Sequence, residues 1–283
     1  MKRILLLLAL TACEDALDQR LAIVNEPRVL AVVSDPAEAK PGAMVTLSAL
    51  VASPQGPLAD APAWAICTAP KPPTEDDAVA PGCLADAVTP LGTSPTVTAT
   101  IPADACTRFG PDVPPGGYRP RDPDPTGGYY QPVRATTPDA GIAFGFPRIT
   151  CGLANAPGPV AHDYLTMYQP NANPVLHPIA LAQAAASTDV TLTAAWDEPE
   201  SYLYYDPQSQ SLVVRRESMR ASWFATAGTL PVDATAVGED DTATSATTTW
   251  HTPATPGPVW LWVVLRDSRG GIATQTIPVT IGP

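Results

Sequence analysis

The chain has 283 residues, 45% of them apolar and 16% charged, and its formal net charge is −12. This length predicts about two domains with packed cores. The 35 prolines and 19 glycines favour short strands joined by rigid loops over long helices. The negative charge excludes nucleic acid as the expected partner, because proteins that bind nucleic acids neutralise phosphates with clustered Lys and Arg.

Residues 1–13 read MKRILLLLALTAC, in which Lys2 and Arg3 precede an apolar run and then small residues. This order is typical of an export signal. The seven apolar residues from Ile4 to Leu10 cover only about 10 Å as a helix, a third of the hydrocarbon core of a bilayer. We therefore predict a signal peptide here and no transmembrane helix.

The tetrapeptide Leu10-Thr11-Ala12-Cys13 resembles the lipobox of bacterial lipoproteins. The resemblance implies that the thiol of Cys13 receives a diacylglyceryl group, that residues 1–12 are cleaved off, and that the new amine is acylated. We expect a protein anchored by lipid to the inner or outer membrane of the cell envelope, facing the periplasm or the exterior. The alternative is an ordinary signal peptide cleaved elsewhere. Without Lys2 and Arg3 the chain keeps 14 basic and 28 acidic residues, a charge of −14, so anionic headgroups would repel the body.

Four cysteines remain after Cys13 is assigned to lipid: Cys67, Cys83, Cys106 and Cys151. An even number in an oxidising compartment predicts two disulfides. Three pairings are open, and we favour the nearest neighbours, Cys67 with Cys83 and Cys106 with Cys151. A zinc site is the weaker alternative because no CxxC pair is present, and a reactive cysteine is disfavoured by export.

Residues 13–26 are predicted to be a tether and residues 27–156 a first domain. Apolar alternation and turn residues predict four strands in its first part: Arg28–Ser34, Ala43–Ala52, Ala63–Cys67 and Thr96–Ile101. With its Asp35-Pro36 and Pro41-Gly42 turns, this opening resembles bacterial immunoglobulin-like and PKD-like modules. A proline- and glycine-rich insert, residues 104–151, follows. Within it we predict a hairpin of residues 129–136 with residues 141–150.

Residues 157–173 are predicted to form a short helix, Val160–Tyr168, and a linker. Residues 174–283 form the second predicted domain, whose final hairpin is similar to that of PKD-like and immunoglobulin-like domains. Its predicted strands are Val175–Leu181, Asp189–Trp196, Ser201–Asp206, Leu212–Arg216, Ser218–Thr226, Ala246–Trp250, Val259–Asp267 and Gly271–Ile281. The fold class is thus all-β: two immunoglobulin-like antiparallel β-sandwiches with a Pro/Gly-rich insert and one short connecting helix.

The unbroken apolar run from Trp260 to Leu265 predicts a strand covered on both faces. The cover would be either the helix near Tyr164 or the first domain. Core packing is the preferred role for the tryptophans of the second domain.

Two groups of residues are candidates for binding. Tyrosines and arginines among glycines suit an adaptable binding loop, with rigid loop packing as the preferred alternative: Tyr118, Arg119, Arg121, Tyr129 and Tyr130. Two acidic groups offer oxygens to calcium, with solvated loop charge as the preferred alternative: Asp122 with Asp124, and Glu239, Asp240 and Asp241. Neither acidic group matches an EF-hand loop, so no metal or cofactor is predicted.

Catalytic signatures are missing from the sequence. His162, His177 and His251 are isolated, and GxSxG, P-loop and GxGxxG motifs are absent, so no enzyme is predicted. The leading hypothesis is a membrane-anchored envelope lipoprotein with a non-catalytic binding or scaffolding role toward an envelope protein or glycan. The alternatives are an exported carbohydrate-active enzyme or accessory module that uses residues 104–135, with Asp122 and Asp124, and a calcium-stabilised adhesin.

Overall fold

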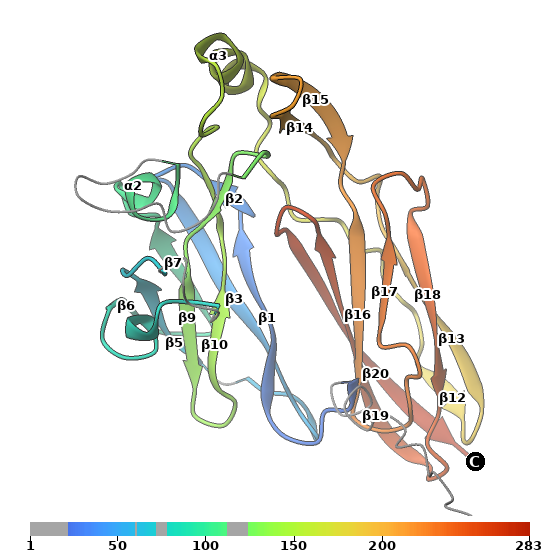
Figure 1. Cartoon of the computed structure of the whole chain (residues 1–283). Coiled ribbons are helices and arrows are strands. Elements are labelled where there is room, and N and C mark those ends of the chain that lie inside the picture. The colour runs from blue at the N-terminus through green and yellow to red at the C-terminus, as the bar shows by residue number, and fades with distance from the viewer. Residues whose placement is uncertain (1–21, 60, 72–77, 112–123) are drawn as a thin grey trace, which may run out of the picture.

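The computed structural model describes residues 22–59, 61–71, 78–111 and 124–283 (Figure 1). Strands dominate these residues, which confirms the predicted all-β class. The helical elements among them are the short helix α2 (Ala105–Phe109), the helix α3 (Gly158–Met167) and a 3-10 turn (Pro81–Cys83). In the described part of the chain, no helix has the length and apolar character needed to cross a membrane.

The first sandwich consists of two antiparallel sheets with a short third sheet at one end. One sheet contains β1 (Arg28–Asp35), β3 (Met44–Ser53), β7 (Thr96–Thr100) and the two-residue β4 (Gly56–Pro57). The facing sheet has the order β10 (Gly141–Gly145), β9 (Val133–Thr137), β5 (Ala63–Cys67) and β6 (Val88–Thr93). The short sheet joins β2 (Glu38–Ala39), β11 (Arg148–Thr150) and β8 (Gly128–Tyr130).

Alternation along the strands builds the core of this sandwich. In β3, Val45 and Leu47 point inward while Met44 and Thr46 face solvent, the period-two pattern of a half-buried strand. Trp64 on β5 fills the space between the sheets, and its indole Nε1 donates a hydrogen bond to the carbonyl of Ser94 at 2.8 Å. The sequence pattern therefore fixes which face of each strand is buried.

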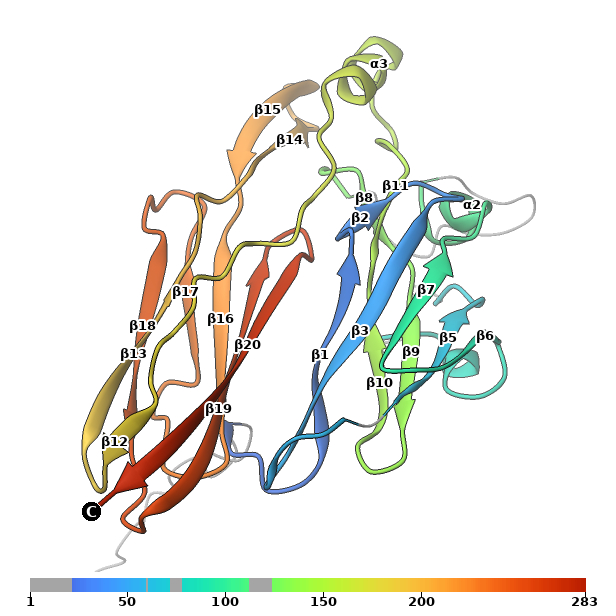
Figure 2. The same cartoon turned by 180° about the vertical axis from the view of Figure 1, so that it is seen from behind.

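The second sandwich has one large sheet and one strand pair. The large sheet has the order β12 (Gln183–Ala185), β20 (Ile272–Gly282), β19 (Gly257–Asp267), β16 (Met219–Ala225) and β17 (Ala234–Val237). The pair facing it is β13 (Asp189–Ala195) with β18 (Ser245–His251). Trp196, Trp223 and Trp250 fill the interior, which confirms core packing for these tryptophans. A separate hairpin, β14 (Ser201–Asp206) with β15 (Ser211–Arg216), lies beside α3 (Figures 1 and 2).

The predicted strand Val175–Leu181 is wrong. Leu176 makes an isolated bridge with Trp196, and β12 at residues 183–185 takes the sheet edge instead. Pro174 and Pro178 lack the N–H groups that a ladder needs. The amide of Ile179 is satisfied by the side chain of Gln275 at 2.9 Å rather than by a neighbouring strand.

Several short strands escaped prediction, among them β6 and β17, and one predicted segment needs correction. β6 contains Pro90 and Gly92, and β17 is only four residues long. The predicted hairpin of the insert is confirmed, because β9 pairs with β10, and it belongs to the first sandwich, because β9 also pairs with β5. The end of the tether is not loose: the amide of Val24 donates to Ala225 at 2.8 Å, and the side chain of Val24 is buried.

The first sandwich covers the outer face of β19. Trp262 and Val264 are wholly buried and pack with Leu30 and Ala31 of β1. This confirms that the strand is covered on both faces and identifies the cover as the first domain rather than α3. Figures 1 and 2 show β1 on the side of the first sandwich that faces the second.

Candidate functional site

A buried ion pair lies at the end of the first sandwich that meets the linker. Arg148 on β11 donates from Nε to Oε2 of Glu38 on β2 at 3.0 Å, and both side chains are at most 1% exposed. Nη2 of Arg148 also donates to the carbonyl of Thr126 at 3.0 Å. Burial by itself lowers the pKa of Arg148, but the combined effect of the Glu38 carboxylate, Tyr168 and Tyr130 outweighs it, and the pKa is raised overall. The arginine is therefore locked in its charged form.

The linker between the domains attaches to the same carboxylate. The hydroxyl of Tyr168 donates to Oε1 of Glu38 at 2.6 Å, and the amide of Asn171 donates to Oε2 at 2.9 Å. Burial raises the pKa of Tyr168 to about 12, so this phenol stays protonated as a donor. Glu38 thus holds the linker against the first sandwich.

A second buried ion pair belongs to the second sandwich. Arg269, in the turn between β19 and β20, donates from Nε to Glu217 at 2.6 Å and from Nη2 to Glu200 at 2.7 Å. Burial and the neighbouring Asp267 raise the pKa of Glu217 to about 7. The side-chain amide of Asn171 donates from Nδ2 to Asp267 at 3.3 Å. Asn171 therefore links the ion pair of Arg269 to that of Arg148.

We call the set of Glu38, Arg148, Tyr168, Asn171, Glu217, Asp267 and Arg269 the junction network. Its arginines and carboxylates are each hydrogen-bonded to other groups of the chain. Because each charged group already has hydrogen-bond partners within the network, the network fixes the geometry of the linker. The network therefore has the properties of a structural lock between two sandwiches.

The predicted binding loop is only partly described. Tyr118, Arg119, Arg121 and Asp122 lie outside the described residues. Tyr129 is 3% exposed because it belongs to β8, which pairs with β11, so this residue packs in the fold, as the preferred alternative has it, and does not contribute to a binding surface.

Tyr130 and Asp124 lie beside the junction network. The half-buried Tyr130 donates from its hydroxyl to the carbonyl of Arg269 at 3.3 Å. Asp124 accepts hydrogen bonds from the amide and the hydroxyl of Thr126, at 2.7 and 2.6 Å. This turn places the carbonyl of Thr126 under Arg148, so Asp124 serves the fold.

The second acidic candidate does not converge on one point. Glu239 pairs with Arg215 at 3.5 Å, while Asp241 accepts from the amide of Ala243 at 2.9 Å. Glu239, Asp240 and Asp241 are exposed, and no group of three His, Cys, Asp or Glu side chains suited to a metal ion occurs among the described residues. The calcium interpretation of residues 239–241 therefore gains no support from their geometry.

The histidines lie far apart on the surface. His177 pairs with Asp197 at 2.7 Å and His251 with Asp189 at 2.8 Å, all with at least half of each side chain exposed. His162 is exposed on α3. Exposed pairs of this kind contribute little to stability.

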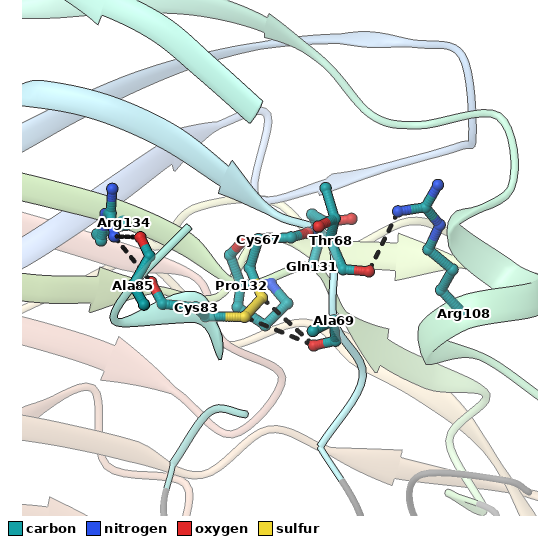
Figure 3. Close-up of a disulfide and its surroundings, with 9 residues drawn as sticks. All are labelled: Cys67, Thr68, Ala69, Cys83, Ala85, Arg108, Gln131, Pro132 and Arg134. Atoms are coloured by element: carbon teal, nitrogen blue, oxygen red, sulfur yellow. Dashed lines mark hydrogen bonds between the residues drawn. A yellow bond between two sulfur atoms is a disulfide. The ribbon is translucent and has the colours of Figure 1, made fainter. Parts of the chain in front are cut away.

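Both predicted disulfides are present, with the favoured pairing. Cys67 on β5 bonds to Cys83 in the 3-10 turn, and Cys106 on α2 bonds to Cys151 after β11. This excludes the zinc and reactive-thiol alternatives for these cysteines. Figure 3 shows the first disulfide with Arg134, whose Nη1 donates to the carbonyls of Cys83 and Ala85 at 3.0 and 2.8 Å. The disulfide loop is thereby fastened to β9.

Two grooves flank β1 where the sandwiches meet. The first, of about 360 Å³, lies between β1, β10 and the turn after β19, and its lining includes Val32, Phe144, Phe146 and Tyr130. The second, of about 280 Å³, lies over the outer face of β16. Its lining includes Arg28, Arg220, Ser222, Phe224 and Asp233, and we call it the arginine groove.

Sequence reasoning did not find the junction network. Its members are single charged residues in different segments, such as Arg148 within an apolar stretch. A lone charge in a strand pattern signals a buried partner but does not say which residue it is.

The comparisons with known proteins give low similarity. No family model and no curated protein match the chain. Among solved structures, it is similar to the Yersinia pseudotuberculosis adhesin InvE, at 11% identity and a TM-score of 0.23, over 88% of this chain and 58% of that chain. Three N-terminal domains of the bacteriophage RB49 outer capsid protein Hoc give 13% identity and a TM-score of 0.22, over 90% and 59%. Escherichia coli alpha-2-macroglobulin gives 11% and 0.27, over 90% and 17%.

The chain spans less than two thirds of each of these proteins. TM-scores at this level support no statement about function.

Proposed function

We propose that this protein is a non-catalytic binding or scaffolding protein of the bacterial cell envelope, anchored to a membrane by lipid on Cys13. The junction network carries the proposal for the folded part. Its buried charged groups bind one another and hold the two sandwiches in one arrangement. A rigid body of this kind suits a protein that binds partners through its surface. The lipobox-like segment at residues 10–13 supports the anchor.

The groove of about 360 Å³ beside β1 is the binding surface that we favour. It lies between two sandwiches held by the network, so its shape is set in advance, and preorganisation lowers the entropy lost on binding. Its aromatic lining suits an envelope protein or a glycan, since both contact aromatic side chains.

The lipid anchor is tested by replacing the sulfur of Cys13 with oxygen, in the Cys13→Ser variant. In detergent phase separation we expect the wild-type protein in the detergent phase and the Cys13→Ser variant in the aqueous phase. The thioether cannot form on serine, and each buried methylene contributes about 0.8 kcal/mol to membrane binding. An unchanged distribution would contradict the anchor.

The binding role is tested by a photo-crosslinking amino acid at Phe144, in the groove, and at Val214, which is 70% exposed on β15, as a matched control. In intact cells we expect one discrete adduct from position 144 and none from position 214. The same crosslinked adducts at positions 144 and 214 would contradict the groove as the binding surface.

The alternatives rank lower. A carbohydrate-active site would use Asp122 and Asp124, but Asp124 is engaged in the turn below Arg148. A calcium-stabilised adhesin would need its acidic residues to converge, and residues 239–241 do not.

A further inference from the structure

The arginine groove concentrates positive charge on a protein whose formal net charge is −12. Arg28 and Arg220 line it, together with Ser222, Phe224 and one acid, Asp233. Arg266 on β19 lies directly opposite Arg220 on β16 in the strand register. Arg220 therefore has a second guanidinium group close to it, although Arg266 itself lines the first groove.

The pair of Arg220 and Arg266 is unfavourable without a counter-charge. Like charges directly opposite on neighbouring strands destabilise a sheet, and burial together with Arg220 lowers the pKa of Arg266. Nη2 of Arg266 donates to the carbonyl of Leu30 at 3.1 Å. Within the described ranges, neither arginine has a carboxylate at ion-pair distance.

Arg28 has an unused hydrogen-bonding edge. Its guanidinium lies over the ring of Phe224, 5.3 Å from the centroid, and its Nε and Nη2 atoms are shielded from solvent without a partner among the described residues. These two nitrogens form the edge that binds two oxygens of one anion side by side. Burial lowers the pKa of Arg28, and nearby Glu26 opposes this effect.

The two arginines of the junction network, which have a structural role, provide a comparison for the arginines of the groove. Arg148 and Arg269 are more deeply buried, yet each has a carboxylate within 3.0 Å and a raised pKa. The arginines of the groove lack such partners, although buried donors without acceptors cost free energy. The missing partner has the chemistry of an anion with several oxygens.

We propose that the arginine groove binds an oxyanion of the phosphate class, either a free phosphate or the headgroup of a phospholipid. Arg28 and Arg220 supply the two guanidinium groups that line the groove, and the hydroxyl of Ser222 is a further donor. Phosphate fits better than a carboxylate because its higher negative charge offsets both guanidinium groups and that of Arg266, which lies next to Arg220. Asp233 opposes the anion and sets a limit on affinity.

The headgroup source rests on the proposed lipid anchor. Residues 14–21 separate Cys13 from Ala22, which is packed in the second sandwich. Nine peptide units span at most about 32 Å, so a lipid on Cys13 would keep Arg28, six residues beyond Ala22, near the bilayer surface.

Calorimetric titration with inorganic phosphate at constant ionic strength tests the site, on the full chain carrying Cys13→Ser. We expect saturable binding of one phosphate, weakened at least about tenfold by either R28Q or R220Q, a loss of about 1.4 kcal/mol. D233N should strengthen binding. R215Q is the matched control, since Arg215 does not line the groove and pairs with Glu239, and it should bind as the parent does.

Absence of saturable binding by the parent, or equal weakening by R215Q, would overturn the proposal. If R28Q fails to fold, R220Q and D233N still test the site. Arg220 is exposed and Asp233 is only partly buried, so neither substitution should disturb the core.

Sedimentation with vesicles distinguishes the sources. Binding to phosphatidylglycerol vesicles that R220Q abolishes, with no binding to phosphatidylcholine vesicles, identifies a headgroup, whereas binding of phosphate alone identifies a soluble ligand. Vesicle binding that R220Q leaves intact contradicts the groove as the site. These experiments do not depend on Cys13, so the proposal of a phosphate site in the groove is tested independently of the proposed lipid anchor.

Discussion

Glu38 and Arg148 are 110 residues apart in the sequence, and their side chains meet at 3.0 Å in an interior that excludes water. The pair joins β2 to β11, and Glu38 also accepts the linker through Tyr168 and Asn171. A single carboxylate therefore couples the first sandwich to the segment that leads into the second.

We predict that breaking this pair is costly. Glu38→Gln or Arg148→Met should each lower the free energy of unfolding by about 3–5 kcal/mol, because the remaining partner is left buried and unpaired. The double variant Glu38→Met with Arg148→Met should cost less than the sum of the two. Urea denaturation measures all three variants.

The exposed pair of Asp104 and Arg108, at 2.7 Å, provides the control for this prediction. Asp104→Asn should cost about 1 kcal/mol or less, because exposed ion pairs contribute little. Additive costs at positions 38 and 148 would show that the two side chains do not act as a pair.

We predict that stability falls as pH rises from about 5 to 7. The pKa of Glu217 is raised to about 7, chiefly by burial, and that of Asp267 is raised for the same reason. Between the unfolded and folded pKa values of Glu217, the folded state binds more protons than the unfolded state, so rising pH favours unfolding. The contribution of Glu217 is at most about 3.5 kcal/mol, at about 1.4 kcal/mol for each pKa unit.

Thermal unfolding over this pH range measures the effect. Glu217→Gln should flatten the profile, whereas Glu198→Gln, which removes a carboxylate that is 83% exposed, should leave it as in the wild type. A wild-type profile that rises from pH 5 to 7 would contradict the burial of Glu217.

We predict that Trp262 holds the sandwiches together. Trp262→Ala should cost about 3–5 kcal/mol and should split a single calorimetric transition into two, since Trp262 packs β19 against Leu30 and Ala31. Trp196→Ala, inside the second sandwich, should lower stability without releasing the first domain from β19. A single transition in Trp262→Ala, with little loss of stability, would show that the interface does not depend on this side chain.

Much of the fold could be predicted because strand alternation is local. β3 and β13 follow from period-two patterns, and the β19–β20 hairpin follows from its Gly270-Gly271 turn, where Gly270 has a φ of +100°. The two disulfides were favoured by sequence proximity, and the structure contains them.

The site could not be predicted because its partners are distant in sequence. Nothing near Arg148 specifies Glu38, and nothing near Arg269 specifies Glu217, since tertiary packing decides these pairs. The sequence does not place Tyr129 in a strand, because the short strand β8 lies among glycines that are typical of loops. The segment Val175–Leu181 has strand-forming residues, but Pro178 within it and Pro174 before it prevent a ladder.

Mass spectrometry of the N-terminal peptide from the membrane fraction tests whether the folded body is attached to a membrane through Cys13. We expect a peptide that begins at Cys13 and carries a diacylglyceryl thioether. A peptide that begins at any other residue, or an unmodified Cys13, would contradict it.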